Sequence, residues 1–212
     1  MKATDFNLPT DLKFDYQNGI TSFKKSRLVI LSARAMGILR ENIIKQVGLE
    51  NARTLIYKFG YQNGFTDFME MKLNYKFDTP EDLLASGPTM HTWEGIVQAT
   101  PKDLRINHVN DDFYFTGIWK NSWEAEQHLA YHEIGEQPVC WSLMGYAAGW
   151  STCFWGKTIV CIEPKCRGKG DDHCEWELQA PERWDKKRVK PYLDAILAGQ
   201  QELATETKTP SI

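Results

Sequence analysis

The sequence predicts a mixed α+β fold, in which an N-terminal hairpin and helices pack against a second unit of strands and helices. Two observations support this class. Long stretches of the first 80 residues carry apolar residues at helical spacing, whereas short β-rich runs gather between residues 92 and 178. The length of 212 residues also suits one large domain or two small ones with a substantial core.

The composition is that of an ordinary globular protein, with 42% hydrophobic residues, 25% charged residues and a formal net charge of -3. Because binding to phosphates needs clustered cations, this balance predicts no direct contact with nucleic acid. No apolar run approaches the ~18 residues of a membrane span, and the first residues lack the layout of a signal peptide. We therefore expect a cytoplasmic protein without membrane contact, whose five cysteines stay reduced.

The N-terminal elements follow from local patterns. Alternation over residues 12–16, the turn pair Asn18-Gly19 and the run 20–23 predict a hairpin. Apolar spacing over residues 26–47 predicts the first long helix.

A second helix is expected from residue 49 to about residue 71. It contains Gly60 and Gly64, four positions apart, which favour a close contact with another helix over a hinge. The apolar surface of these two helices indicates a dimer or domain interface.

The middle of the chain predicts a change from helix to strands. A short helix over residues 80–85 is expected to end at Ser86-Gly87-Pro88, since proline disfavours a helix interior. Three strands are then predicted at residues 92–99, 104–109 and 113–119.

The remaining elements complete the second unit. Ser122 is placed to cap a helix, and Pro138 opens another that covers residues 140–154. Strands are expected at residues 158–162 and 174–178, on either side of a polar loop.

After Pro181 a charged, helix-prone tail follows. Its apolar positions step by four and three, as in a coiled-coil seam. Two interpretations are open: an amphipathic helix, or a connector to a further domain. The seam consists of Val189, Leu193, Ile196, Gln200 and Leu203.

Cys140, Glu163, Cys166 and Cys174 form the sharpest chemical signal. A strand end, the polar glycine-rich loop 167–173 and a returning strand can bring three donors around one ion. Cys140 lies at a predicted helix start, where the helix dipole favours a thiolate, and can supply the fourth donor. Four donors without a position for water predict a closed, structural zinc site.

Other interpretations of this region stay open. The cysteines can be small buried hydrophobic residues, as we expect for Cys153 and Cys161, and an iron–sulfur cluster is a further alternative because five thiols are present. Alternative ligands are His173, Glu175 and Glu177. Cations that could neutralise the cluster are Lys165, Arg167 and Lys169.

His91 and Trp119 indicate a binding pocket. His91 is expected where a loop enters a strand, and Trp119 ends a strand. An imidazole donates or accepts a hydrogen bond and an indole donates one, so together they can hold the hydroxyl of a small aromatic alcohol. The alternative is a core histidine and a packing tryptophan. His128 and His132 lie four positions apart on a predicted helix. This spacing suits a pair of metal ligands, but we favour a solvated helix face.

No motif predicts catalysis. The segment 149–158 ends like a phosphate-binding loop, but its glycines are seven apart where such a loop needs five. No nucleophile with a partner base and no helix-turn-helix signature stands out.

Four segments resemble a known family, namely residues 87–91, 119–125, 137–149 and 163–174. They are similar to the effector-sensing domain of bacterial phenol- and xylene-responsive activators, which are sigma-54-dependent regulators of aromatic catabolism. The similarity runs in order from about residue 11 to residue 184.

The resemblance implies specific roles. In phenol sensors of the family a His and a Trp hold the phenolic hydroxyl, and they match His91 and Trp119. Three Cys and one Glu bind a structural zinc beside the pocket. Their matches are Cys140, Glu163, Cys166 and Cys174.

The family fold is a vinyl-reductase-type α/β ligand-binding domain joined to an N-terminal region. It implies a dimerisation region at residues 1–80, a zinc- and aromatic-ligand-binding domain at 81–180, and a linker helix and tail at 181–212. It also implies a homodimer, with AAA+ and DNA-binding domains in the full-length protein that this chain does not contain. Gly117 and Trp155 depart from the family's phenol sensors and are expected to reshape the cavity.

We therefore expect a sensor that binds phenol or a small substituted phenol, and not an enzyme. The alternative is a vinyl-reductase-type or tetrapyrrole-handling enzyme of the same fold, for which the sequence offers no cofactor site. A trafficking module is a third hypothesis, against which the metal set and His91 argue.

Overall fold

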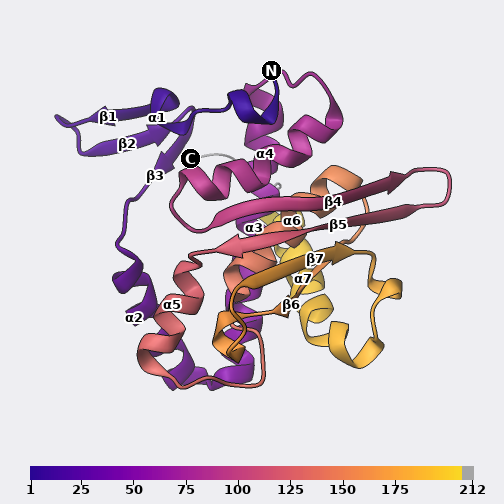
Figure 1. The fold of residues 1–212 in the computed structure, drawn as a ribbon. Coiled ribbons are helices and arrows are strands. Elements are labelled where there is room, and N and C mark those ends of the chain that lie inside the picture. Colours follow the sequence, from indigo (N-terminus) through magenta and orange to yellow (C-terminus); the bar gives the residue numbers. More distant parts are fainter. Residues whose placement is uncertain (207–212) are drawn as a thin grey trace.

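The computed structural model describes residues 1–206 and has the predicted mixed α+β architecture. A small three-stranded sheet lies near the N-terminus, and a four-stranded sheet covers a group of helices (Figure 1). Within the described residues, none of the helices is both long and apolar enough to cross a membrane. Short 3₁₀ turns occur at Ala3–Asp5, Arg167–Lys169 and Pro181–Arg183.

The predicted N-terminal hairpin is confirmed. After the short helix α1 (Leu8–Asp11), strand β1 (Leu12–Asp15) pairs antiparallel with β2 (Ile20–Phe23). A third strand, β3 (Ser26–Leu28), pairs with β2 and was not predicted.

The first long helix begins later than expected. Helix α2 covers Ala33–Val47, and the Ser32 hydroxyl caps it by accepting a hydrogen bond from the Ala35 amide at 3.1 Å. The prediction of a helix from residue 26 was wrong because residues 26–28 pair with β2, a tertiary contact that the apolar spacing does not record.

Helix α3 (Leu49–Asn74) is confirmed, and so is the close helix contact at its glycines. Its partner is α6 (Trp141–Trp155). A Cβ atom added to Gly60 would lie 2.2 Å from the Ser142 carbonyl oxygen, so only glycine permits this approach. The contact is reciprocal, because a Cβ on Gly145 of α6 would lie 2.0 Å from the Tyr57 carbonyl oxygen of α3.

Helix α4 covers Pro80–Trp93 and continues through Pro88, contrary to the prediction that it ends there. Proline cannot donate to the carbonyl four residues earlier, which here belongs to Leu84. The indole N–H of Trp150 on α6 donates to this carbonyl at 3.1 Å and replaces the missing bond. His91 therefore lies on the last turn of a helix and not at a loop–strand junction.

The four-stranded sheet is antiparallel with the order β4-β5-β7-β6. One long strand, β4, replaces the two strands predicted at 92–99 and 104–109, with a register shift between Pro101 and Asp103. The other strands lie close to their predicted positions. The bounds are β4 Gln98–Asn107, β5 Asp112–Lys120, β6 Val160–Lys165 and β7 Cys174–Gln179.

Helix α5 (Trp123–Tyr131) begins at Ser122 as predicted, since the Ser122 hydroxyl accepts a hydrogen bond from the Ala125 amide. Helix α7 (Lys186–Glu206) packs against α3. The tail therefore forms a helix over residues 186–206, as the amphipathic-helix interpretation predicts. The rest of the predicted tail, residues 207–212, lies outside the described residues. The buried positions of α7 include Val189, Tyr192, Ala195 and Ile196.

Candidate functional site: an aromatic cavity beside a cysteine cluster

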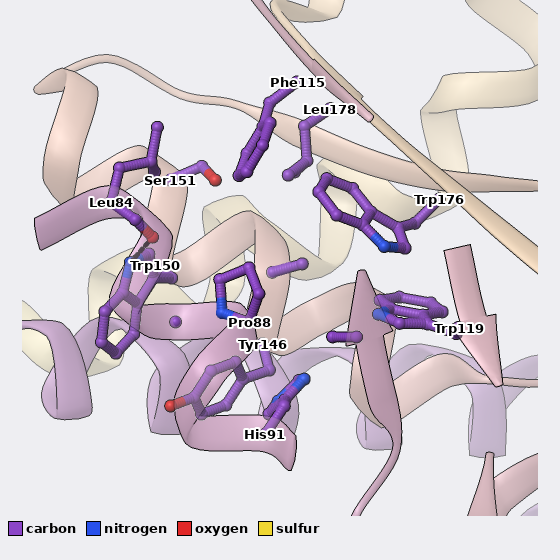
Figure 2. Close-up of a pocket in the computed structure, with 13 residues that line it drawn as sticks. Leu84, Pro88, His91, Phe115, Trp119, Tyr146, Trp150, Ser151, Trp176 and Leu178 are labelled. Carbon is purple, nitrogen blue, oxygen red and sulfur yellow. Dashed lines mark hydrogen bonds between the residues drawn. The ribbon is translucent and has the colours of Figure 1, made fainter. Parts of the chain in front are cut away.

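The structure places His91 and Trp119 on the wall of one cavity. His91 comes from the last turn of α4 and Trp119 from the end of β5, and both side chains are buried. The cavity has a volume of about 30 Å³. Figure 2 shows the surrounding side chains, which are mainly apolar and aromatic. They include Leu84, Phe115, Tyr146, Trp150, Trp176 and Leu178.

Burial decides the charge of His91. The side chain is only 4% exposed, and desolvation lowers its pKa to about 3. Its ring lies against Tyr146 on α6, with ring centroids 4.0 Å apart. At neutral pH the imidazole is therefore uncharged and presents one N–H donor and one bare nitrogen acceptor.

The polar ring atoms of His91 and Trp119 have no partners in the described part of the chain. Across residues 1–206, no hydrogen bond reaches the His91 ring or the Trp119 indole N–H. Buried polar groups are normally paired, so these atoms are available to a small molecule with a complementary group. An apolar enclosure with a few free polar atoms is typical of a small-molecule binding site.

Sequence reasoning missed several of the lining residues. Tyr146 and Trp150 are one helical turn apart on α6, and Trp176 alternates with Leu178 on the inward face of β7. Those periodicities are visible in the sequence, and they predict which side chains are buried. They do not predict which of the buried side chains border a cavity. The expectation that Trp155 reshapes the cavity was wrong, because its ring stacks on His108 and it does not line the cavity.

A second cavity, of about 230 Å³, shares His91 and Tyr146 with the first. It is also lined by Glu94, just after α4. Burial and the nearby charge of Asp67 raise the pKa of Glu94 to about 8. Glu94 is therefore largely protonated at neutral pH.

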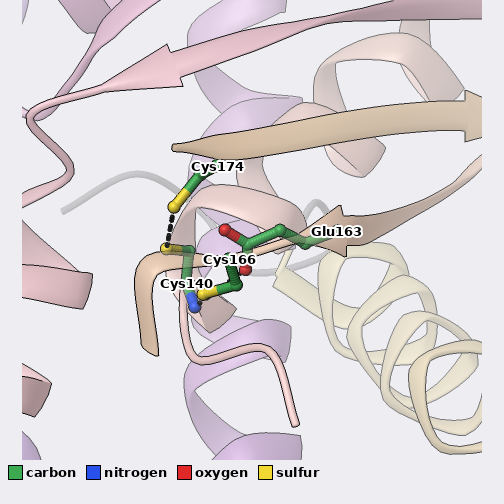
Figure 3. Close-up of side chains that lie close together, drawn as sticks. All are labelled: Cys140, Glu163, Cys166 and Cys174. Atoms are coloured by element: carbon green, nitrogen blue, oxygen red, sulfur yellow. Dashed lines mark hydrogen bonds between the residues drawn. The ribbon is translucent and has the colours of Figure 1, made fainter. Parts of the chain in front are cut away.

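The four predicted metal donors come together in a second buried site. Their ligand atoms all lie within 4.8 Å of one another, and all four residues are buried (Figure 3). Cys140 precedes α6, Glu163 lies on β6, Cys166 precedes a 3₁₀ turn and Cys174 begins β7. The cluster could hold a metal ion.

The geometry and chemistry of the donors fit a tetrahedral ion. The Sγ atoms of Cys140 and Cys174 are 3.8 Å apart, the separation expected when two sulfurs each lie about 2.3 Å from a zinc ion. Oε1 of Glu163 is buried and has no partner in the part of the chain described, which leaves it free to bind a cation. None of the cysteines forms a disulfide.

Burial opposes the thiolate that the helix dipole favours at Cys140. Burial raises the pKa of Cys140, and the neighbouring sulfur atoms and carboxylate raise it further. Burial also raises the pKa of Glu163, with a contribution from the charge of Cys166. Without a cation the four acids would not all ionise, whereas a bound divalent ion would stabilise their charged forms.

Two of the three predicted cations pair with carboxylates outside the cluster. Lys165 pairs with Glu175 at 3.4 Å, and Lys169 pairs with Asp171 at 3.5 Å. The buried cation near Cys140 is Arg40 of α2, which lies 3.6 Å from Glu124 and was not predicted. Its role depends on packing between the N-terminal region and α5, which local sequence patterns do not reveal.

The remaining predicted ligands lie elsewhere. His173 contacts Asp172 and Glu175, and these residues are not part of the four-residue cluster. His128 does not lie on a solvated face, because it is buried and its Nδ1 lies 3.2 Å from Arg40. His132 instead contacts Glu41, with Nε2 and Oε2 2.7 Å apart.

The chain is similar to known regulatory proteins. A family profile described as activator of aromatic catabolism matches residues 7–107, and the profile of the vinyl-reductase-type domain matches residues 119–180. The phenol regulator MopR of Acinetobacter guillouiae is 35% identical over 199 residues, which cover 90% of this chain and 35% of that protein. The transcriptional regulatory protein XylR of Pseudomonas putida is 27% identical over 205 residues, which cover 94% of this chain and 36% of that protein.

A solved structure shares the fold. The phenol-responsive sensory domain of the transcription activator PoxR, crystallised with phenol, matches with a TM-score of 0.81 and 29% identity, covering 90% of this chain and 94% of that one. The fold and the enclosed cavity thus define a small-molecule-sensing regulatory domain. The chain belongs to the family of effector-sensing domains of aromatic-catabolism activators. It spans about a third of the length of the curated relatives, whose names are those of regulators, in agreement with the prediction of a regulatory sensor.

Proposed function

We propose that this chain senses phenol or a small substituted phenol, which binds in the aromatic cavity between His91 and Trp119. The observation that carries the proposal is the pair of unpartnered polar rings in an otherwise apolar enclosure. The neutral imidazole accepts a hydrogen bond from the phenolic O–H, and the Trp119 indole N–H donates one to the hydroxyl oxygen. A phenol hydroxyl is both donor and acceptor, so it satisfies both residues.

This arrangement distinguishes phenols from plain hydrocarbons. Toluene fills the same apolar space, but it leaves both ring nitrogens unpaired after water has been displaced. Each unsatisfied buried polar group costs roughly 1–3 kcal/mol. We therefore expect phenol to bind at least about tenfold more tightly than toluene, since tenfold corresponds to about 1.4 kcal/mol.

The cysteine cluster is proposed to hold one structural zinc ion. Cys140, Glu163, Cys166 and Cys174 supply four donors, and a bound zinc would hold β6, β7 and the start of α6 together. A site with four protein ligands is closed to substrate, so we assign the ion no role in chemistry. Its position at the start of α6 supports the cavity, because α6 carries Tyr146 and Trp150.

Signalling is proposed to pass from this domain to an ATPase and a DNA-binding domain in the full-length protein. Residues 1–80 are assigned to a homodimer interface, residues 81–180 to sensing and residues 181–212 to a linker. Exposed apolar side chains on the N-terminal region support the dimer. They are Val29, Ile30, Leu31, Ile38, Leu39, Leu55 and Phe59. Light scattering is expected to give twice the chain mass of 24.5 kDa, and a strictly monomeric chain would contradict the dimer.

Calorimetric titration tests the sensing function. Phenol is expected to bind one site per chain, toluene to bind more weakly, and His91→Ala to lose the preference for phenol. If His91→Ala proves unstable, His91→Phe keeps an aromatic ring and removes the acceptor. Equal affinity of the wild-type chain for phenol and toluene would refute the proposed role of the two ring nitrogens. Phenol-dependent ATPase activity of a longer protein that contains this segment tests the link to an output.

A further inference from the structure

A third polar ring borders the aromatic cavity. Trp176 lies on β7 and its side chain is 2% exposed. Its indole N–H is buried and has no hydrogen-bond partner in the described chain. Figure 2 shows the nitrogen of Trp176 on the edge of the ring that faces the space towards Trp119 and His91.

Other buried tryptophans of the chain do pair their indole N–H. Trp141 donates to the Pro138 carbonyl at 2.8 Å, and Trp150, on the same cavity wall, donates to the Leu84 carbonyl at 3.1 Å. Trp184 also lacks a partner, but it does not line the cavity. An unpaired indole N–H is therefore not shared by all buried tryptophans, and that of Trp176 borders the cavity.

Gly117 permits the position of Trp176. The two residues face each other across β5 and β7 in the sheet register. A Cβ atom at residue 117 would lie 2.4 Å from Cζ2 and 2.6 Å from Cε2 of the Trp176 ring. Any larger residue at 117 would displace the indole, so the glycine and the tryptophan act together to place a donor in the cavity.

We propose that Trp176 is a specificity-determining residue, whose indole N–H binds a second acceptor on the effector, next to the phenolic hydroxyl. This inference rests on the proposed function of the cavity. One lone pair of a phenolic oxygen is delocalised into the ring, so that oxygen accepts one hydrogen bond well, and Trp119 uses it. The second indole needs an acceptor of its own, which an ortho-alkoxy or ortho-hydroxy group supplies. The preferred effectors are therefore ortho-oxygenated phenols.

A pair of ligands of equal shape tests this proposal. Ortho-methoxyphenol and ortho-ethylphenol differ in one oxygen, so the ratio of their affinities isolates the added acceptor. In the wild-type chain calorimetry is expected to give a ratio that favours the methoxy compound. In Trp176→Phe the ratio is expected to fall about tenfold, because a hydrogen bond worth about 1.4 kcal/mol is lost, while the affinity for ortho-ethylphenol changes little.

Two further variants make the test specific. Gly117→Ala keeps the indole but crowds it, and also crowds the Thr100 carbonyl oxygen of β4 at 2.4 Å, so it is expected to lower the same ratio. Trp184→Phe removes an unpaired indole N–H outside the cavity and is expected to leave the ratio unchanged. Binding of ortho-ethylphenol and thermal unfolding report whether each variant is folded.

The outcomes separate the two proposals. If phenol binds in a His91-dependent way but the ratio is the same in wild type and Trp176→Phe, the role of Trp176 is refuted and the proposed function stands. A ratio that falls equally in Trp184→Phe refutes it as well. If phenol and both substituted phenols fail to bind the folded wild-type chain, the proposed function is refuted and this inference with it.

Discussion

The two buried sites of this domain differ in how far their polar atoms contact other polar atoms of the protein. In the cysteine cluster, side chains and backbone amides contact one another closely, as in the 3.5 Å approach of the Val139 amide to Cys166. In the aromatic cavity, His91 and Trp119 contact no polar partner in the described chain. The cluster brings together four acidic groups, which would all ionise only with a bound cation. Burial, in contrast, keeps His91 neutral.

This difference separates a site that supports the fold from a site that is open to a ligand. Helix α6 joins them, because it begins after Cys140 and carries Tyr146 and Trp150 along the cavity. Unpaired polar atoms at the cavity lower stability, and a rigid neighbouring cluster can offset that cost. The comparison predicts that changes at the cluster act first on folding and changes at the cavity first on binding.

The largest effect is expected at the cluster. Cys166→Ser removes one of four donors, and we expect loss of bound zinc together with a fall in unfolding free energy of more than about 4 kcal/mol, the range typical of a lost structural metal. Metal analysis and thermal unfolding measure both quantities. Cys153→Ser is the matched control, since Cys153 is only partly buried and lies outside the cluster. A Cys166→Ser protein with full metal content and wild-type stability would contradict the assignment.

A smaller effect is expected on α6 between the two sites. In Gly145→Ala the new methyl group would meet the Tyr57 carbonyl oxygen at 2.0 Å, so α6 must move away from α3. We expect a loss of about 3 kcal/mol in unfolding free energy and weaker phenol binding, with zinc retained. Gly135→Ala is the control, because a Cβ there would have no atom within 4 Å. Wild-type stability of Gly145→Ala would show that the helices are not as close as described.

The smallest effect concerns charge near the cavity. The pKa of Glu94 is raised to about 8 by burial and by the charge of Asp67. A carboxyl group with a raised folded-state pKa favours the folded state below its unfolded pKa of about 4.5, and this stability is lost as pH rises towards 8. Glu94→Gln stays neutral, so it is expected to raise the melting temperature relative to wild type at pH 8 and not at pH 5. An equal difference at both pH values would mean that Glu94 is not perturbed.

Sequence patterns predicted the fold class and most elements because local signals determined them. The turn pair Asn18-Gly19 and the cap at Ser122 each act within a few residues. The failures involve distant partners. Helix α4 passes through Pro88 because Trp150 supplies the missing donor, and residues 26–28 form a strand because they pair with β2.

The same distinction applies to the sites. The spacing of Glu163, Cys166 and Cys174 on one strand–loop–strand unit made the cluster predictable from the sequence, and the structure brings these residues together with Cys140. Arg40 and Trp176 were missed, because each acquires its place from contacts between elements far apart in the chain.

A crystal structure of the domain with phenol would test the central claim most directly. We predict that the phenol oxygen lies within about 3.2 Å of one ring nitrogen of His91 and of Nε1 of Trp119, the usual limit for such hydrogen bonds, with the ring enclosed between α4, α6 and the sheet. Phenol seated elsewhere, or with its oxygen against the apolar wall and both nitrogens still unpaired, would contradict the account.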